Sequence, residues 1–217
     1  MRITIDEIEL NYEVSGQGSP IILLHGNGED HRIFDVLAKQ LSEDFTVYAI
    51  DSRGHGESTK TNRLSYQLMA EDVMKFIKAK QIEKPILYGF SDGGIIGLLV
   101  ACSSPTLLSK LIISGANSNP KAVVWYWRVW FRIYCFFTRS VKMKLMMYEP
   151  NITKKDLHKI EIPTLVLAGE KDIIKEDDTR FIAGSIKNAT LKILPNENHS
   201  SYVHSPKLYK IIKPFIK

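Results

Sequence analysis

A serine stands in the pentapeptide Gly89-Phe90-Ser91-Asp92-Gly93, between a short apolar run and a stretch with helical spacing. This is the context in which a G-x-S-x-G turn forms a nucleophile elbow. The turn pushes the serine hydroxyl outward, and the two glycines let strand and helix approach closely. The start of the helix would supply free N–H groups and partial positive charge where an oxyanion forms. The motif therefore predicts Ser91 as a catalytic nucleophile, in preference to an incidental serine in a glycine-rich turn.

A serine nucleophile needs a general base, and a histidine base needs an acid that orients its ring. Asp172 and His199 each follow an apolar run, at the ends of the segments LAGEKD and PNENH. In a parallel sheet such positions lie at the carboxyl edge, where ligands bind. The chain order Ser91, Asp172, His199 is also the order of the triad in proteins with this elbow. We predict these three residues as catalytic; the rivals expected at the surface are His204, Asp177 and Asp178.

A glycine-containing turn, His25-Gly26-Asn27-Gly28, follows the first strongly apolar run. In this architecture the second oxyanion donor comes from such a turn. The backbone N–H groups of Asn27 and Asp92 are therefore predicted to form the oxyanion hole. His25 itself is expected to be structural.

The segments that must position these residues alternate between buried strands and amphipathic helices. Strands are expected within 20–26, 46–51, 85–91, 108–116, 162–172 and 189–194, after a strand pair within 4–14. Helical spacing marks 33–41, 68–77 (with Ser65 as its N-cap), 93–102, 177–186 and the segment from 206. This alternation predicts an α/β fold with a mostly parallel, twisted sheet and helices on both faces.

The alternation stops after Asn117. Residues 117–167 contain no glycine, and eight of the 13 residues from 125 to 137 are aromatic, including all three tryptophans. We therefore predict an α/β core made of 1–118 and 161–217, with 119–160 as a helical insertion. At helical spacing, one apolar stripe is predicted to line an acyl pocket as substrate-binding residues: Trp127, Trp130, Phe131 and Tyr134. Two alternatives stay open: the stripe packs on the core, or the helix contacts anionic lipid or a second copy.

Several motifs in the same order resemble the α/β-hydrolase superfamily of serine hydrolases. They are HGNG, the turn DSRGHGES (51–58), GFSDGG, GEKD and the late Asn-His pair. The resemblance implies the α/β-hydrolase fold for the core 1–118 and 161–217 and a structural role for the 51–58 turn. It also implies that the insertion 119–160 forms a helical cap over the serine. The elbow also resembles that of the biphenyl-hydrolase-like amino-acid ester hydrolases. This implies that Asp92 helps to receive a substrate α-amino group, although an acid at a helix start is equally explained by the dipole.

The charge of the chain is uneven. The 217 residues carry 29 Lys and Arg against 24 Asp and Glu, a net charge of +5. Residues 119–160 hold nine basic and two acidic residues, a net +7, so the remainder carries −2. Because the basic residues alternate with apolar ones and no recognised module is present, nucleic-acid binding is not expected.

Two unpaired cysteines, Cys102 and Cys135, and the absence of a signal pattern predict a cytoplasmic protein. No apolar run is long enough to span a membrane. The predicted activity is hydrolysis of a small carboxylic ester or thioester through an acyl-enzyme, with a small-molecule acyl substrate and no metal or organic cofactor. The alternatives are other triad chemistry, such as carbon–carbon bond hydrolysis, and a non-catalytic ligand receptor or regulatory protein. Peripheral membrane contact or dimer contact through the cap is the remaining partner prediction.

Overall fold

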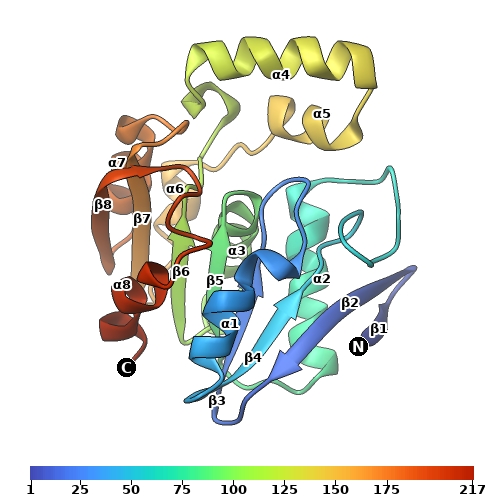
Figure 1. Ribbon diagram of the computed structural model, residues 1–217, viewed down its shortest axis with the longest axis vertical. Coiled ribbons are helices and arrows are strands. Elements are labelled where there is room, and N and C mark those ends of the chain that lie inside the picture. Colours follow the sequence, from blue (N-terminus) through green and yellow to red (C-terminus); the bar gives the residue numbers. More distant parts are fainter.

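The computed structural model describes all 217 residues and has an eight-stranded sheet at its centre (Figure 1). The strand order is β1-β2-β4-β3-β5-β6-β7-β8; β2 runs antiparallel to its neighbours β1 and β4, and the other pairs are parallel. The strands are β1 (Arg2–Ile5), β2 (Ile8–Ser15), β3 (Ser19–Leu24), β4 (Phe45–Ile50), β5 (Ile86–Phe90), β6 (Lys110–Ser114), β7 (Thr164–Lys171) and β8 (Ala189–Asn198). The predicted mostly parallel sheet is confirmed.

Helices cover both faces of the sheet, as the alternating pattern predicted. A core of 21 residues joins one face to α1 (Asp35–Leu41), which follows the short 3-10 helix η1 (His31–Phe34), and to α8 (Lys207–Ile216). A larger core of 32 residues joins the other face to α2 (Tyr66–Ala79), α3 (Asp92–Ser103), α6 (Lys154–Leu157) and α7 (Glu176–Ser185). The central strands are apolar on both sides because both of their faces are covered. Ser65 caps α2 by accepting a hydrogen bond from the Leu68 N–H.

The segment after β6 rises above the carboxyl edge of the sheet (Figure 1). It contains the 3-10 helix η2 (Pro120–Ala122), α4 (Trp125–Thr138) and α5 (Val141–Tyr148). The last part of the predicted cap returns to the body, because Ile152, Leu157 and Ile160 are buried in the larger core. The cap that stands over the sheet is therefore shorter than 119–160 and consists of η2, α4 and α5.

None of the helices has the length and apolar character needed to cross a lipid bilayer. Cys102 and Cys135 are both buried and unpaired, as expected. The cytoplasmic location inferred from them stays a prediction.

Candidate active site

Ser91 lies between β5 and α3 with a backbone φ of +52°, which is rare for a residue other than glycine. The glycines on either side are required by close contacts. A Cβ at Gly89 would lie 2.1 Å from the Gly93 carbonyl oxygen, and a Cβ at Gly93 would lie 2.0 Å from that of Leu24. The Ser91 N–H donates to the Ser114 carbonyl at 2.8 Å, which fixes the turn to β6. The predicted strand–turn–helix elbow is thus present, with strain held by its neighbours.

The fold brings Asp172 and His199 to Ser91 from the ends of β7 and β8. The Ser91 Oγ lies 3.1 Å from His199 Nε2, and His199 Nδ1 lies 2.7 Å from Asp172 Oδ1. The Asp172 side chain is only 3% exposed, and its Oδ1 also accepts a hydrogen bond from the Ile174 N–H at 2.9 Å. This continuous chain of contacts can carry a proton from the serine to the imidazole while the carboxylate orients the ring.

Gly115, which the sequence analysis did not single out, makes room for the histidine. Its φ is +64°, and a Cβ there would lie 2.8 Å from His199 Cε1. A side chain would therefore both strain the backbone and displace the imidazole ring. The glycine directly after the run LIIS was the signal for this tight turn.

The two predicted oxyanion donors are free to bind a ligand. No hydrogen bond in the structure uses the backbone N–H of Asn27 or of Asp92, the first residue of α3. The turn that carries Asn27 lies against the serine, since a Cβ at Gly26 would be 3.2 Å from Ser91 Cβ. Two unpaired N–H groups beside a serine hydroxyl are the donor set that a tetrahedral oxyanion needs.

The Asp92 side chain is buried under two hydrogen bonds. Its Oδ1 accepts from the Tyr66 hydroxyl at 2.7 Å and its Oδ2 from Asn27 Nδ2 at 2.8 Å. Burial raises the pKa of Asp92 to about 6, against the opposing effect of these two donors. Asn27 Nδ2 also lies 3.3 Å from the Lys142 carbonyl oxygen, so one amide joins the oxyanion turn, the elbow and the cap.

The cavity beside Ser91 is small, about 10 Å³. Its walls include the predicted Ser91, Asp92 and His199 together with Tyr66 and Glu149. The apolar part of the wall comes from residues of the cap and of the β7–α7 loop, namely Val123, Met146, Ile173 and Ile174.

Two further carboxylates near the serine were missed from the sequence. The Glu149 carboxylate accepts the Tyr66 N–H at 2.9 Å, and the Glu29 carboxylate accepts the Gly26 N–H at 2.9 Å. Burial raises the pKa of Glu29. No local pattern marks Glu149, because its partner is 83 positions away in the chain.

The predicted aromatic wall requires a correction. Trp127, Trp130, Phe131 and Tyr134 do not line the cavity beside Ser91. Only Phe131 is buried; the other three residues are 36%, 50% and 42% exposed, respectively. The physical reason is that α4 turns Phe131 and Cys135 toward the body, where Phe131 packs against Ala122, Val123 and Ile174.

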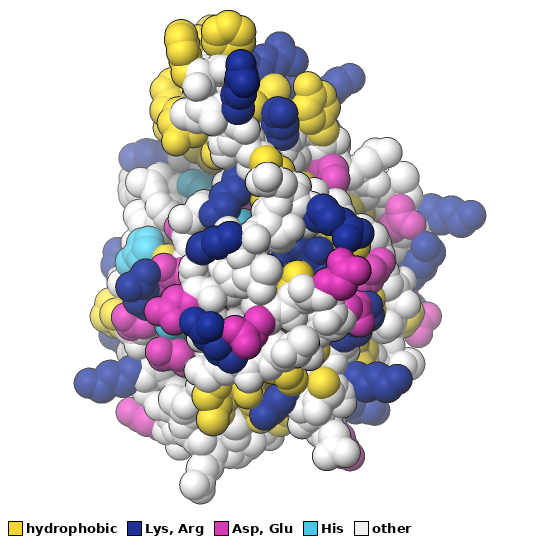
Figure 2. Space-filling view, turned by 90° about the vertical axis from the view of Figure 1, so that its right-hand side faces the viewer, with side chains coloured by type: hydrophobic (Ala, Val, Ile, Leu, Met, Phe, Trp, Pro, Cys, Tyr) yellow, Lys and Arg dark blue, Asp and Glu magenta, His cyan; other side chains and the backbone are white.

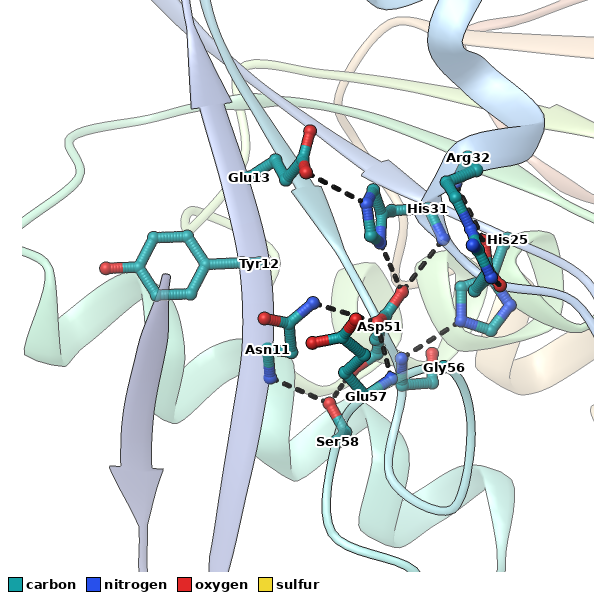
Figure 3. A network of polar contacts seen from close by, with 12 residues as sticks. Asn11, Tyr12, Glu13, His25, His31, Arg32, Asp51, Gly56, Glu57 and Ser58 are labelled. Atoms are coloured by element: carbon teal, nitrogen blue, oxygen red, sulfur yellow. Dashed lines mark hydrogen bonds and ion pairs between the residues drawn. The ribbon is translucent and has the colours of Figure 1, made fainter.

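The turn at 51–58 forms a polar network beneath the oxyanion turn (Figure 3). Asp51 is fully buried and accepts hydrogen bonds from the backbone N–H groups of His31 and Glu57 at 2.8 Å, and from Asn11 Nδ2 at 3.0 Å. His25 Nε2 accepts the Ser52 N–H at 3.0 Å. These contacts agree with the structural roles expected for His25 and for this turn.

One group of side chains has ligand atoms close enough for a metal ion. The carboxylates of Asp30 and Asp51 and the His31 ring offer atoms within 4.8 Å of one another. However, Asp51 already accepts the His31 ring N–H at 2.7 Å, and the Asp30 carboxylate accepts from Arg32 at 2.9 Å. These existing bonds explain the group as structural.

Comparison with known proteins supports the same architecture. The α/β hydrolase fold family matches residues 19–134, which is more than half of the chain. The human protein named serine hydrolase BPHL is 24% identical over 100% of this chain and 86% of its own.

Among solved structures, Est816, described as an N-acyl homoserine lactone degrading enzyme, superimposes with a TM-score of 0.84 at 20% identity, over 99% of this chain and 100% of its own. A thermophilic esterase from Thermogutta terrifontis gives a TM-score of 0.82 at 21% identity, over 100% of this chain and 98% of its own. The predicted fold class is confirmed by these matches.

Proposed function

Because the chain belongs to the α/β-hydrolase fold family and is similar over its full length to human serine hydrolase BPHL, we propose that it hydrolyses small carboxylic esters or thioesters through an acyl-enzyme. The observation that carries this proposal is the chain of contacts from Ser91 through His199 to Asp172, with distances of 3.1 and 2.7 Å. The two free N–H groups of Asn27 and Asp92 beside the serine support it further.

In the proposed first step, Ser91 Oγ attacks the acyl carbon while His199 Nε2 takes the hydroxyl proton. Asp172 holds the Nδ1–H tautomer and stabilises the imidazolium that forms. The oxyanion accepts hydrogen bonds from the Asn27 and Asp92 N–H groups. The tetrahedral intermediate then expels the alcohol or thiol, which takes the proton from His199.

In the second step, His199 removes a proton from water, and the hydroxide attacks the acyl-serine carbonyl. Collapse of this second intermediate releases the carboxylic acid and returns the proton to Ser91. Both steps use only groups of the chain, together with the water molecule of the second step.

The decisive experiment replaces Ser91 by alanine and measures turnover of p-nitrophenyl acetate and of the corresponding thioacetate. We expect turnover to fall by about 10⁴-fold or more, with thermal unfolding unchanged within a few degrees. The matched control is Ser103→Ala, an exposed serine at the other end of α3. Undiminished turnover in Ser91→Ala would refute the mechanism.

Labelling with a fluorophosphonate probe distinguishes an active hydrolase from a non-catalytic ligand receptor when it is measured beside ester turnover. Labelling of Ser91 without turnover of any ester across a panel of acyl lengths would favour a ligand receptor instead.

Amino-acid esters are a second candidate substrate class. The carboxylates of Asp92 and Glu149 line the cavity and could face an ammonium group. Because Asp92 is already hydrogen-bonded by Tyr66 and Asn27, Glu149 is the more available partner. Alanine benzyl ester should then be cleaved faster than its N-acetyl derivative, and Glu149→Gln should reduce the preference while the exposed Glu161→Gln should not.

A further inference from the structure

A second and larger cavity lies inside the cap, with a volume of about 300 Å³. It is bounded by η2, α4 and α5, and three of the side chains in its wall are basic: Lys121, Arg128 and Arg132. No acidic side chain lines it. The volume is at the lower end of the range for small-molecule sites.

This cap cavity and the cavity beside Ser91 share two wall residues, Val123 and Met146. The cavity beside Ser91, at about 10 Å³, has room for about one water molecule and for no acyl chain. A substrate whose ester lies at Ser91 must therefore extend beyond this cavity, and the two shared side chains mark where the cap cavity adjoins it. Met146 is unbranched and adaptable, so it can move aside. The cap cavity then offers space for the rest of the substrate.

The basic side chains of the cap cavity have no partners in the protein. None of the three makes a side-chain hydrogen bond or an ion pair, although the chain has 13 ion pairs elsewhere. The Nε of Arg128 is buried and unpaired. A buried guanidinium N–H without an acceptor is unfavourable, and a carboxylate or a phosphate would satisfy it.

We propose that the cap cavity binds the anionic far end, a carboxylate or a phosphate, of the substrate whose ester is cleaved at Ser91. The inference rests on the proposed hydrolase function and adds its substrate class. The charges of the two cavities favour a substrate that lies with its ester at Ser91 and its anionic end in the cap cavity. Asp92 and Glu149 beside the serine would repel an anion there, whereas Lys121, Arg128 and Arg132 would attract it in the cap.

The test compares p-nitrophenyl monoesters of glutarate and adipate with the neutral pentanoate and hexanoate esters of the same chain length. For the wild type, the ratio of kcat/KM for the anionic ester to kcat/KM for the neutral ester of the same length should exceed one. Arg128→Gln should lower that ratio by about ten- to a hundredfold, since it removes a charged hydrogen bond. Lys144→Gln, an exposed residue of α5 outside this cavity, should leave the ratio unchanged.

Competitive inhibition by glutarate and by propyl phosphate then tells which anion is preferred. A wild type that favours the neutral esters, or a ratio unchanged in Arg128→Gln, would overturn the proposal. Either outcome leaves hydrolysis itself intact, because loss of turnover in Ser91→Ala is measured with neutral esters.

The opposite side of α4 carries a separate observation. Six of its residues point away from Phe131 and are 45–79% exposed, and none is charged. They form what we term the outer α4 face: Trp125, Tyr126, Val129, Ile133, Phe136 and Phe137. Hydrophobic side chains gather at this end of the molecule, with Lys and Arg side chains beside them (Figure 2). A contiguous apolar surface of this kind marks an interaction site.

The charge around the outer α4 face favours an anionic partner over a second copy of the chain. Residues 121–148 contain six basic residues and no acidic one, and Arg132, Arg139 and Lys144 are exposed. Two copies of the chain joined through this face would bring like charges together, which is unfavourable. An anionic bilayer offers phosphates to the basic residues and an apolar layer to the aromatic side chains.

We infer that the outer α4 face lies on an anionic lipid surface, with the active site beneath the cap. Sedimentation with phosphatidylcholine vesicles, with and without phosphatidylglycerol, tests this inference. The protein should bind the anionic vesicles, and added salt should weaken binding.

The double variant Phe136→Ser/Phe137→Ser should bind at least about tenfold more weakly, since it removes two large apolar side chains. Val36→Ser, which changes a 40% exposed apolar residue on α1 away from the cap, should bind like the wild type. Absence of binding to anionic vesicles, or a dimer that the double variant dissociates, would overturn the inference.

Discussion

At Gly26 the oxyanion turn packs against the nucleophile. A Cβ there would lie 2.7 Å from Glu29 Oε2, 3.2 Å from Ser91 Cβ and 3.3 Å from Phe90 Cδ1. The Glu29 carboxylate is the end of a flexible side chain and can rotate away. Ser91 cannot, because its N–H is bound to the Ser114 carbonyl and its backbone is held at φ +52°. In Gly26→Ala the oxyanion turn must therefore move, and the Asn27 N–H moves with it.

The magnitude follows from the small size of the displacement. Contact at 3.2 Å is relieved by a shift of a few tenths of an ångström, which misaligns one donor without removing it. Removing an oxyanion donor costs about 10²–10³-fold in kcat, so we expect a loss of about ten- to a hundredfold. Stability should change by no more than about 1 kcal/mol, because Gly26 lies outside the helices and strands and does not have a positive φ.

The assay is kcat for p-nitrophenyl acetate beside urea unfolding of the same variant. Gly184→Ala is the matched control, because its Cβ would meet nothing within 4 Å and the residue lies in α7. This control should keep full activity and gain about 0.5–1 kcal/mol of stability. If Gly26→Ala retains roughly half of the wild-type kcat, the oxyanion role of the turn is refuted.

Three further predictions concern the Asp92 carboxyl group, the Met146 side chain and the Cys102 thiol. The Asp92 pKa of about 6 exceeds its ordinary 3.8, so the unfolded chain binds fewer protons between these values. The wild type should therefore lose about 2 kcal/mol of stability as the pH rises from about 4 to 7. Asp92→Asn should lack this loss in urea titrations across that range. Met146→Ala should shorten a side chain that lies in the walls of both cavities and shift the kcat/KM optimum to longer p-nitrophenyl acyl esters, at about 0.8 kcal/mol per added methylene. Burial raises the pKa of the Cys102 thiol to about 12, so iodoacetamide at mildly alkaline pH should modify it only after unfolding, as mass spectrometry can measure.

The body of the fold was predictable because each of its elements is marked locally. Apolar runs identify the buried strands, and the residues just after them lie at one edge of a parallel sheet. Ser91, Asp172 and His199 could therefore be selected from three distant segments before their contacts were known. Contacts between residues that are distant in the chain, such as that of the Tyr66 backbone N–H with the Glu149 carboxylate, leave no such mark.

The orientation of α4 could not be predicted for a different reason. With eight aromatic residues in 13, apolar side chains lie around most of the helix, so periodicity does not distinguish its inner side from its outer side. Packing fixes the orientation of α4, because Phe131 contacts Ala122, Val123 and Ile174 in a small separate cluster. That arrangement turns Arg128 and Arg132 toward the cap cavity and leaves the bulk of the aromatic surface outside.

Because most aromatic side chains of α4 face outward, the basic residues of the cap act in a different environment from the one predicted. A cap with its aromatic stripe inward would favour neutral acyl chains and leave the arginines in solvent, where salt screens them. With Arg128 partly buried against a cavity that shares the Met146 side chain with the cavity beside Ser91, the same charge acts at short range in a poorly solvated site. The net charge of +7 in 119–160 thus has two separate consequences, one inside the cap and one on its surface. They can be measured independently, because Arg128 faces the cavity whereas Phe136 and Phe137 face solvent.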